Sequence, residues 1–154
     1  MPIKSFRGKI ADGVVDTIAL HTNNGSIGYK IVKFEIVTSA PTTTSEHLCQ
    51  VWSISASAEA AKGLNTIDFS DNTLLATALW SNDSSAQTYS DDFHVIFDNI
   101  VFNQDIFITN QTITGSNECN YHIELEQVKL NLDENTVATL KDIRSIERTD
   151  IGPP

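Results

Sequence analysis

Acidic side chains and one histidine gather in a short stretch of the sequence. Asp91, Asp92, His94 and Asp98 lie close enough together to share a cation. Hard cations such as Ca²⁺ bind several oxygen ligands, often supplied by loops. The spacing does not match an EF-hand loop, and charged loop residues are usually exposed. We therefore favour a solvated acidic segment, with Asp91, Asp92 and Asp98 as calcium ligands in the alternative interpretation.

A second group of titratable residues follows the period of a β-strand. His122, Glu124 and Glu126 alternate with Tyr121, Ile123 and Leu125, so the polar side chains share one face. Two carboxylates on one face can serve as acid and base in catalysis. An antiparallel sheet also commonly exposes one polar face to water, and we favour that interpretation.

Other chemical motifs are missing from the sequence. The four histidines, His21, His47, His94 and His122, show none of the HExxH, HxH or CxxC spacings of zinc sites. The sequence has no GxSxG nucleophile motif and no glycine-rich phosphate loop. We therefore expect neither an enzyme nor a cofactor, and we assign no catalytic residue.

Aromatic and sulfur side chains each allow two interpretations. Trp52, Trp80 and Tyr89 can line a sugar-binding face, but large aromatic residues of β domains more often fill the core. Cys49 and Cys119 are too few for a disulfide scaffold. They are expected to be buried thiols, with a single bridge as the alternative.

The net charge excludes several classes of partner. Ten Lys and Arg stand against twenty Asp and Glu, which gives a formal net charge of −10. Nucleic acids and anionic membranes bind cationic surfaces, so neither is an expected partner. No apolar run reaches the length of a membrane span, and the first residues lack the apolar core of a signal peptide. At 154 residues, a single domain spanning 1–154 is expected.

The clearest predicted element is a long β-strand that begins at Cys119. Strand alternation continues to Gln127 and then slips by one position, which predicts a bulge or a sharp twist there. Asp133 then has the properties of a helix N-cap. We expect one short C-terminal helix at about 133–146, followed by a flexible tail at 149–154, and we expect this helix to dock because an isolated helix of this length is marginal in water.

Short β-strands account for most of the remaining chain. The expected strands are 3–10, 14–20, 29–38, 48–55, 67–69, 93–97, 100–102 and 106–111. Asn24-Gly25 is a strong hairpin signal between the second and third of them. Residues 56–63 fit a short helix or an ordered loop, and 74–80 fit a buried strand slightly better than a helix.

One of these strands has an irregular pattern. In 29–38, Val32, Phe34 and Ile36 fall on one face, whereas Tyr29 and Ile31 fall on the other, so both faces are expected to be partly covered. The spacing of strands and turns across the chain predicts an all-β protein, an antiparallel β-sandwich of jelly-roll type.

Several stretches in order along the chain resemble small virion proteins of marine tailed bacteriophages. These stretches are RGKIADG at 7–13, TNNG at 22–25, GYKIVKF at 28–34, DFSDNTLLA at 68–76, NQDIFIT at 103–109 and YHIELE at 121–126. The resemblance implies a structural protein made in the host cytoplasm and carried on the capsid exterior. It also implies major capsid protein subunits as partners and a homo-oligomer, with a trimer preferred.

Two other functions stay open at the level of sequence. One is a tail or neck component, or a carbohydrate- or receptor-binding β module, which would present the aromatic residues beside loop carboxylates. The other is a small enzyme that uses Glu124, Glu126 or the acidic stretch, and it would need a pocket with carboxylates of perturbed pKa.

Overall fold

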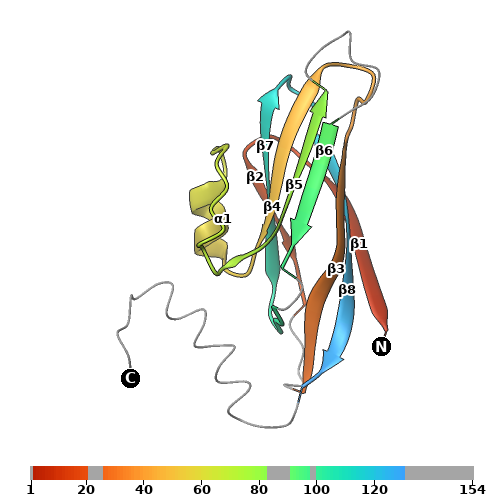
Figure 1. The fold of residues 1–154 in the computed structure, drawn as a ribbon, viewed down its shortest axis with the longest axis vertical. Coiled ribbons are helices and arrows are strands. Elements are labelled where there is room, and N and C mark those ends of the chain that lie inside the picture. Colours follow the sequence, from red (N-terminus) through yellow and green to blue (C-terminus); the bar gives the residue numbers. More distant parts are fainter. Residues whose placement is uncertain (1, 21–25, 83–90, 98–99, 131–154) are drawn as a thin grey trace.

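The computed structural model describes residues 2–20, 26–82, 91–97 and 100–130 as two packed β-sheets and one short helix (Figure 1). This architecture confirms the predicted all-β sandwich at the level of two antiparallel sheets. The elements are β1 (Ile3–Ile10), β2 (Val14–Ile18), β3 (Ile27–Thr38), β4 (Ser45–Trp52), α1 (Ser55–Ala61), β5 (Leu74–Asn82), β6 (Asp91–Ile96), β7 (Ile106–Thr114) and β8 (Cys119–Lys129). No helix among the described residues is long and apolar enough to cross a membrane.

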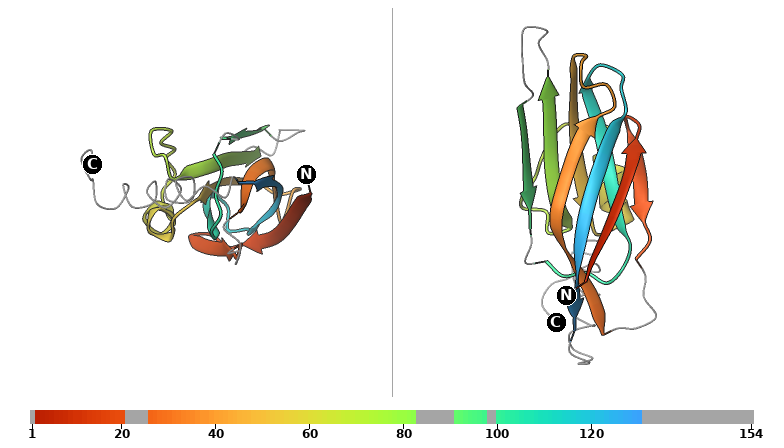
Figure 2. Two further views of the ribbon diagram at one scale, coloured as in Figure 1. Left: turned by 90° about the horizontal axis from the view of Figure 1, so that it is seen from below. Right: turned by 90° about the vertical axis from the view of Figure 1, so that its right-hand side faces the viewer.

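The strands divide into a small sheet and a larger one. Sheet A has the order β1-β8-β3, and sheet B has the order β2-β7-β4-β5-β6. All the strand pairs are antiparallel. Figure 2 shows the sheets stacked face to face, with α1 on the side of sheet B that faces away from sheet A.

The central strand of sheet A is β8, in agreement with its clear sequence pattern. Its alternating residues Tyr121, Ile123 and Leu125 are buried, whereas His122 and Glu124 between them are partly exposed. β8 pairs with β1 from Ile3 to Ile10 and with β3 from Ile27 to Thr38. Strand alternation thus gives β8 one face for the core and one for solvent.

A bulge in β3 corrects two predictions. The register of β3 against β8 shifts between Ile31 and Lys33, which leaves Val32 as the extra residue. The extra residue reverses the alternation, so Tyr29 and Ile31 are buried on the same side as Phe34. β3 therefore has one covered face rather than two. The bulge expected after Gln127 is absent, because β8 keeps its register there.

The expected hairpin at Asn24-Gly25 is also wrong. Residues 21–25 lie outside the described part, but the strands on either side belong to different sheets. β2 pairs with β7, and β3 pairs with β8. The chain therefore crosses from one sheet to the other between these strands, and a two-residue hairpin cannot join them.

Other short elements were predicted with mixed success. The buried strand at 74–80 is confirmed as part of β5, and the helix alternative for 56–63 is realised as α1. Residues 67–69 form no strand, and 100–102 contribute only an isolated bridge between Phe102 and Tyr29. The expected C-terminal helix at 133–146 and the tail at 149–154 lie outside the described residues.

A missing side chain in β1 makes room for a contact between the sheets. Gly8 pairs with Tyr121, and a Cβ atom at Gly8 would lie 2.9 Å from the Tyr121 ring. The ring passes over β1, and its hydroxyl donates a 2.6 Å hydrogen bond to Asp16 of β2. Burial and this hydrogen bond raise the pKa of the Tyr121 phenol above its usual value.

We expect Gly8→Ala to lower the free energy of unfolding by about 1–2 kcal/mol, because the added methyl group displaces the Tyr121 ring from Asp16. Tyr121→Phe should cost about 1 kcal/mol through loss of the same hydrogen bond. Urea denaturation of both single variants and the double variant measures the effect. The double variant should cost less than the sum, whereas additive costs would show that Gly8 acts independently of Tyr121.

Candidate functional site

The acidic stretch proposed as a cation site is not assembled in the described residues. Asp91 and Asp92 are the first residues of β6, where they pair in register with Ser81 and Trp80 of β5. Asp92 and His94 are exposed, and Asp98 lies outside the described part of the chain. No group of three or more possible metal ligands occurs among the described residues.

The turn at 68–73 uses its carboxylates for local hydrogen bonds. The backbone N–H and hydroxyl of Ser70 donate to Asp68, and those of Thr73 donate to Asp71. The hydrogen bonds from Ser70 lower the pKa of the Asp68 carboxyl. These residues stabilise a turn, as expected for Asp followed two positions later by Ser or Thr.

Of the aromatic residues proposed for sugar binding, the two that the structure describes pack inside the protein or against its core. Trp52 is 5% exposed, and its indole N–H donates to the Thr109 hydroxyl at 3.2 Å. Trp80 is partly buried and packs against the main core. Tyr89 lies outside the described residues. Trp52 therefore fills the interior instead of presenting a stacking surface to a sugar.

The carboxylates of β8 belong to a ladder of charges on the outer face of sheet A. Glu126 lies 3.3 Å from Lys30, and Glu124 lies 3.9 Å from His122. Their side chains are about one-third exposed, and they point away from the core face of β8. Exposed pairs of this kind contribute little to the free energy of unfolding. The ladder instead makes the outer face of sheet A a charged surface.

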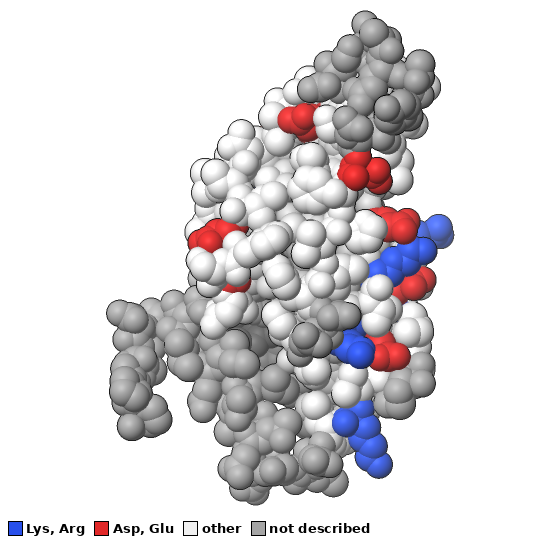
Figure 3. All heavy atoms as spheres, viewed as in Figure 1, with Lys and Arg blue, Asp and Glu red and all other residues white. Residues whose placement is uncertain are grey.

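Basic side chains on the strands are confined to sheet A. Its strands carry six, Lys4, Arg7, Lys9, Lys30, Lys33 and Lys129, beside three acidic residues, Glu35, Glu124 and Glu126. The strands of sheet B carry four acidic residues, Asp16, Glu46, Asp91 and Asp92, and no Lys or Arg. Figure 3 shows the basic atoms along the side of the molecule that sheet A occupies. The two sheets therefore differ in charge although the whole chain is acidic.

The outer face of sheet A contains a shallow basin that crosses all three strands. Its lining includes Arg7 and Lys9 from β1, His122 from β8, and Glu35 and Val37 from β3. Arg7, His122 and Glu35 form one row across the strands. No carboxylate of the described residues lies within ion-pair distance of Arg7, so this guanidinium is available to a partner. Val37 is 46% exposed and adds apolar surface beside the charges.

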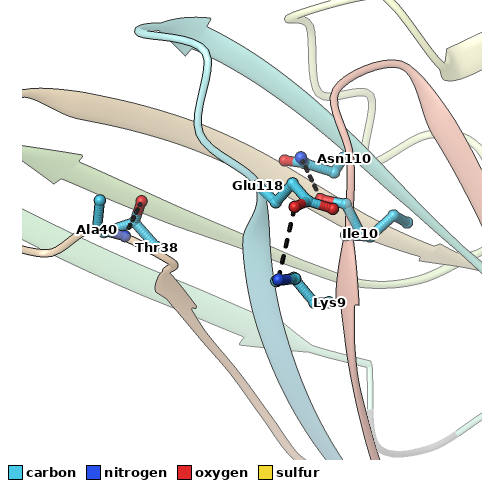
Figure 4. A network of polar contacts seen from close by, with 6 residues as sticks. All are labelled: Lys9, Ile10, Thr38, Ala40, Asn110 and Glu118. Carbon is cyan, nitrogen blue, oxygen red and sulfur yellow. Dashed lines mark hydrogen bonds and ion pairs between the residues drawn. The ribbon is translucent and has the colours of Figure 1, made fainter.

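A buried polar cluster joins the two sheets at the end of the sandwich where β8 begins. His47 of β4 is fully buried, and its Nε2 lies 2.8 Å from the Thr38 hydroxyl of β3. Its Nδ1 lies 3.0 Å from the Thr112 hydroxyl of β7. Asn110 of β7 donates to the carbonyl of Ile10 in β1 at 3.1 Å (Figure 4). Both sheets thus contribute polar atoms to one interior cluster.

The hydrogen bonds around His47 determine its protonation. The Thr112 hydroxyl donates to the carbonyl of Asn117, so it accepts from a protonated Nδ1 of His47. Thr38 accepts from the N–H of Ala40, and its hydroxyl hydrogen can be donated to Nε2. These partners suit a neutral ring with one N–H and one acceptor nitrogen. Burial lowers the pKa of His47, and the Asn110 hydrogen bond and the Asp12 charge offset only part of this effect.

This cluster was not predicted from the sequence. A signal was present, because His47 shares one face of its strand with Cys49 and Val51, and Asn110 shares one face of its strand with Ile106 and Ile108. Polar residues at inward positions of a strand need partners inside the protein. Such residues therefore mark where two sheets exchange hydrogen bonds.

No family model matches the chain, and no curated protein or solved structure matches it either. The described residues place a charged outer face on sheet A and a buried polar cluster between the sheets. The former can bind a partner, whereas the latter holds the sheets together.

We expect acid to destabilise the fold through His47. Because the pKa of His47 is lower in the folded protein than the unperturbed value of 6.5, the unfolded chain binds a proton at His47 more readily. The contribution of neutral His47 to the free energy of unfolding is therefore complete above pH 6.5 and declines as the pH falls below it. The free energy of unfolding of His47→Gln should therefore change less between pH 7.5 and pH 5 than that of the wild type. Denaturant unfolding at each pH measures the difference.

His94 provides a matched control because it is exposed. His94→Gln should keep the pH dependence of the wild type. Equal pH dependence in the wild type and His47→Gln would show that His47 is not the titrating group.

Proposed function

We propose that this chain is a structural protein of a bacteriophage virion, a decoration or cement protein that binds the outer surface of the capsid. The observation that carries the proposal is the difference between the two sheets. Sheet A presents an outer face with basic and apolar side chains that no described element covers, and sheet B carries no Lys or Arg on its strands. A molecule with two unlike faces binds a surface in one orientation.

The order of the strands supports a jelly-roll topology for this sandwich. In a jelly roll, the chain alternates between two sheets so that early strands pair with late ones. Here the first strand lies beside the last, and the last lies beside the third, in sheet A. In sheet B, the second lies beside the seventh, followed by the fourth, fifth and sixth. Jelly rolls are common among viral capsid domains, which agrees with a place in a virion.

Sheet A is the face that we assign to the capsid. Arg7 and Lys9 of β1 can pair with carboxylates of the major capsid protein, and Val37 of β3 supplies apolar contact area on the other side of β8. The opposite side of the molecule, which carries α1 and the acidic sheet B, then faces solvent, where net negative charge favours solubility. The implied trimer would place one such face on each of three neighbouring capsid subunits.

The test mixes purified protein with capsids that lack it and measures the bound fraction by cosedimentation. We expect saturation at a fixed ratio of protein to capsid subunits. Protein that stays in the supernatant at every concentration would overturn the capsid assignment. Binding to purified tails, or to glycans on an array, would favour a tail component or a carbohydrate-binding module in its place.

A charge-reversal pair tests the assignment of sheet A. Arg7→Glu should weaken capsid binding by about tenfold or more, because it places a carboxylate where a cation meets an acidic surface. Lys62→Glu, beside α1 and remote from sheet A, makes the same change in net charge and should bind as the wild type does. Equal binding by the two variants would show that another face makes the contact, even if the protein does decorate capsids.

A further inference from the structure

The two cysteines face each other across the interior of the sandwich. Cys49 lies in β4 of sheet B, between Ala78 of β5 and Asn110 of β7. Cys119 is the first residue of β8 in sheet A, between Ile10 of β1 and Thr38 of β3. Both thiols are fully buried in the main core. Cys49 donates to Oδ1 of Asn110 at 3.5 Å, Cys119 donates to the carbonyl of Asn120 at 3.6 Å, and Cys119 lies near enough to raise the pKa of Cys49.

Two contacts between the sheets hold the thiols close together. Thr38, the neighbour of Cys119 in sheet A, bonds to His47 at 2.8 Å. Ile10, its neighbour on the other side, accepts from Asn110 at 3.1 Å. Asn110 has a short side chain, yet it reaches a main-chain carbonyl of the opposite sheet, as Figure 4 shows. On one side of the cysteine pair β3 therefore lies close to β4, and on the other side β1 lies close to β7.

We propose that Cys49 and Cys119 form a disulfide that links the two sheets when the chain meets a low-molecular-weight disulfide such as oxidised glutathione. One cysteine loses its proton and attacks the oxidant, which gives a mixed disulfide and one glutathione thiol. The other cysteine then loses its proton and displaces the second glutathione. Two protein thiols are oxidised to one bridge, and one glutathione disulfide is reduced to two thiols.

Burial controls when this reaction takes place. Desolvation raises the pKa of Cys49 well above its usual value, so the reactive thiolate is scarce in the folded protein. The thiols react readily while the chain is unfolded or folding, because they are then exposed to the oxidant. The redox state acquired during folding is therefore retained by the native protein. This inference does not depend on the proposed function.

The bridge would connect strands that are far apart in the sequence. It closes a loop from Cys49 to Cys119 that contains α1, β5, β6 and β7. Closing a long loop restricts the unfolded chain and so stabilises the folded one. A link between facing strands of two sheets is also the arrangement of the disulfide in antibody domains.

The experiment compares full-length protein refolded from urea with and without oxidised glutathione. After alkylation with iodoacetamide, we expect the oxidised sample to have lost two hydrogens and to carry no alkyl group. Peptide mapping should recover a Cys49–Cys119 cross-link, and the melting temperature should rise by about 10 °C. Native protein treated in the same way without unfolding should react far more slowly.

Cys49→Ala and Cys119→Ala serve as controls, since neither can form the bridge within one chain. Each should give the same melting temperature with and without oxidant. The proposal would be overturned if wild-type protein refolded with oxidised glutathione is then alkylated at both thiols. Attached glutathione, or bridges only between chains, would overturn it as well. The wild-type measurement decides the matter even if a variant fails to fold.

Discussion

The architecture depends on the burial of one face of β8 against sheet B. In the described part of the chain, sheet A has three strands, and β8 lies between β1 and β3. Ile123 and Leu125 of β8 are fully buried, and Phe34 of β3 is buried beside them in the core shared with sheet B. Each such side chain contributes about 1.5–3 kcal/mol when it leaves water. Without this contact, sheet A would be a small isolated sheet with one apolar face exposed, which is not stable in water.

Polar groups inside the sandwich constrain the packing in a different way. The apolar core tolerates small changes in the spacing of the sheets, whereas His47, Thr38 and Asn110 need partners at hydrogen-bond distance. Their contacts fix how closely the sheets approach where β8 begins. The neutral state of His47 and the juxtaposition of Cys49 and Cys119 follow from that approach. Stability at this end therefore responds to acid and to oxidation through neighbouring groups.

The outer surfaces show how an acidic protein can still carry a basic face. A net charge of −10 describes the whole chain, but the basic residues of the strands all belong to sheet A. Three rows across that face each hold one basic and one acidic residue (Lys30 with Glu126, Lys33 with Glu124, Arg7 with Glu35), and Arg7 has no carboxylate within ion-pair distance among the described residues. The long-range field of the protein opposes acidic partners, while the local arrangement on sheet A attracts them. A protein whose two faces differ in charge in this way can bind a partner surface with one particular face.

The sequence by itself determined the character of each strand and little of its pairing. The alternation around Ile123 assigned the two faces of β8, and the apolar run at 74–80 favoured the strand that forms. Strand ends were less well predicted: the strand expected at 48–55 spans Ser45–Trp52. Both faces of a strand are encoded by its own residues, so periodicity reveals them. The sequence also placed Glu124 and Glu126 on a polar face, as the structure has them. It also placed His47 on the same side of its strand as Cys49 and Val51, but periodicity does not identify the partners that a buried histidine finds on other strands.

Tertiary structure decided which strands became neighbours. Asn24-Gly25 favoured a local hairpin, yet β2 and β3 pair with β7 and β8, and this pairing places Ile18 of β2 and Phe34 of β3 in one core. The bulge at Val32 has the same origin: one extra residue turns Tyr29 and Ile31 to the side of Phe34, so that all three enter one core. The division of charge between the sheets likewise exists only once distant strands have been sorted into them. Local sequence fixes which side of a strand is apolar, and the free energy of burying those sides together selects the partners.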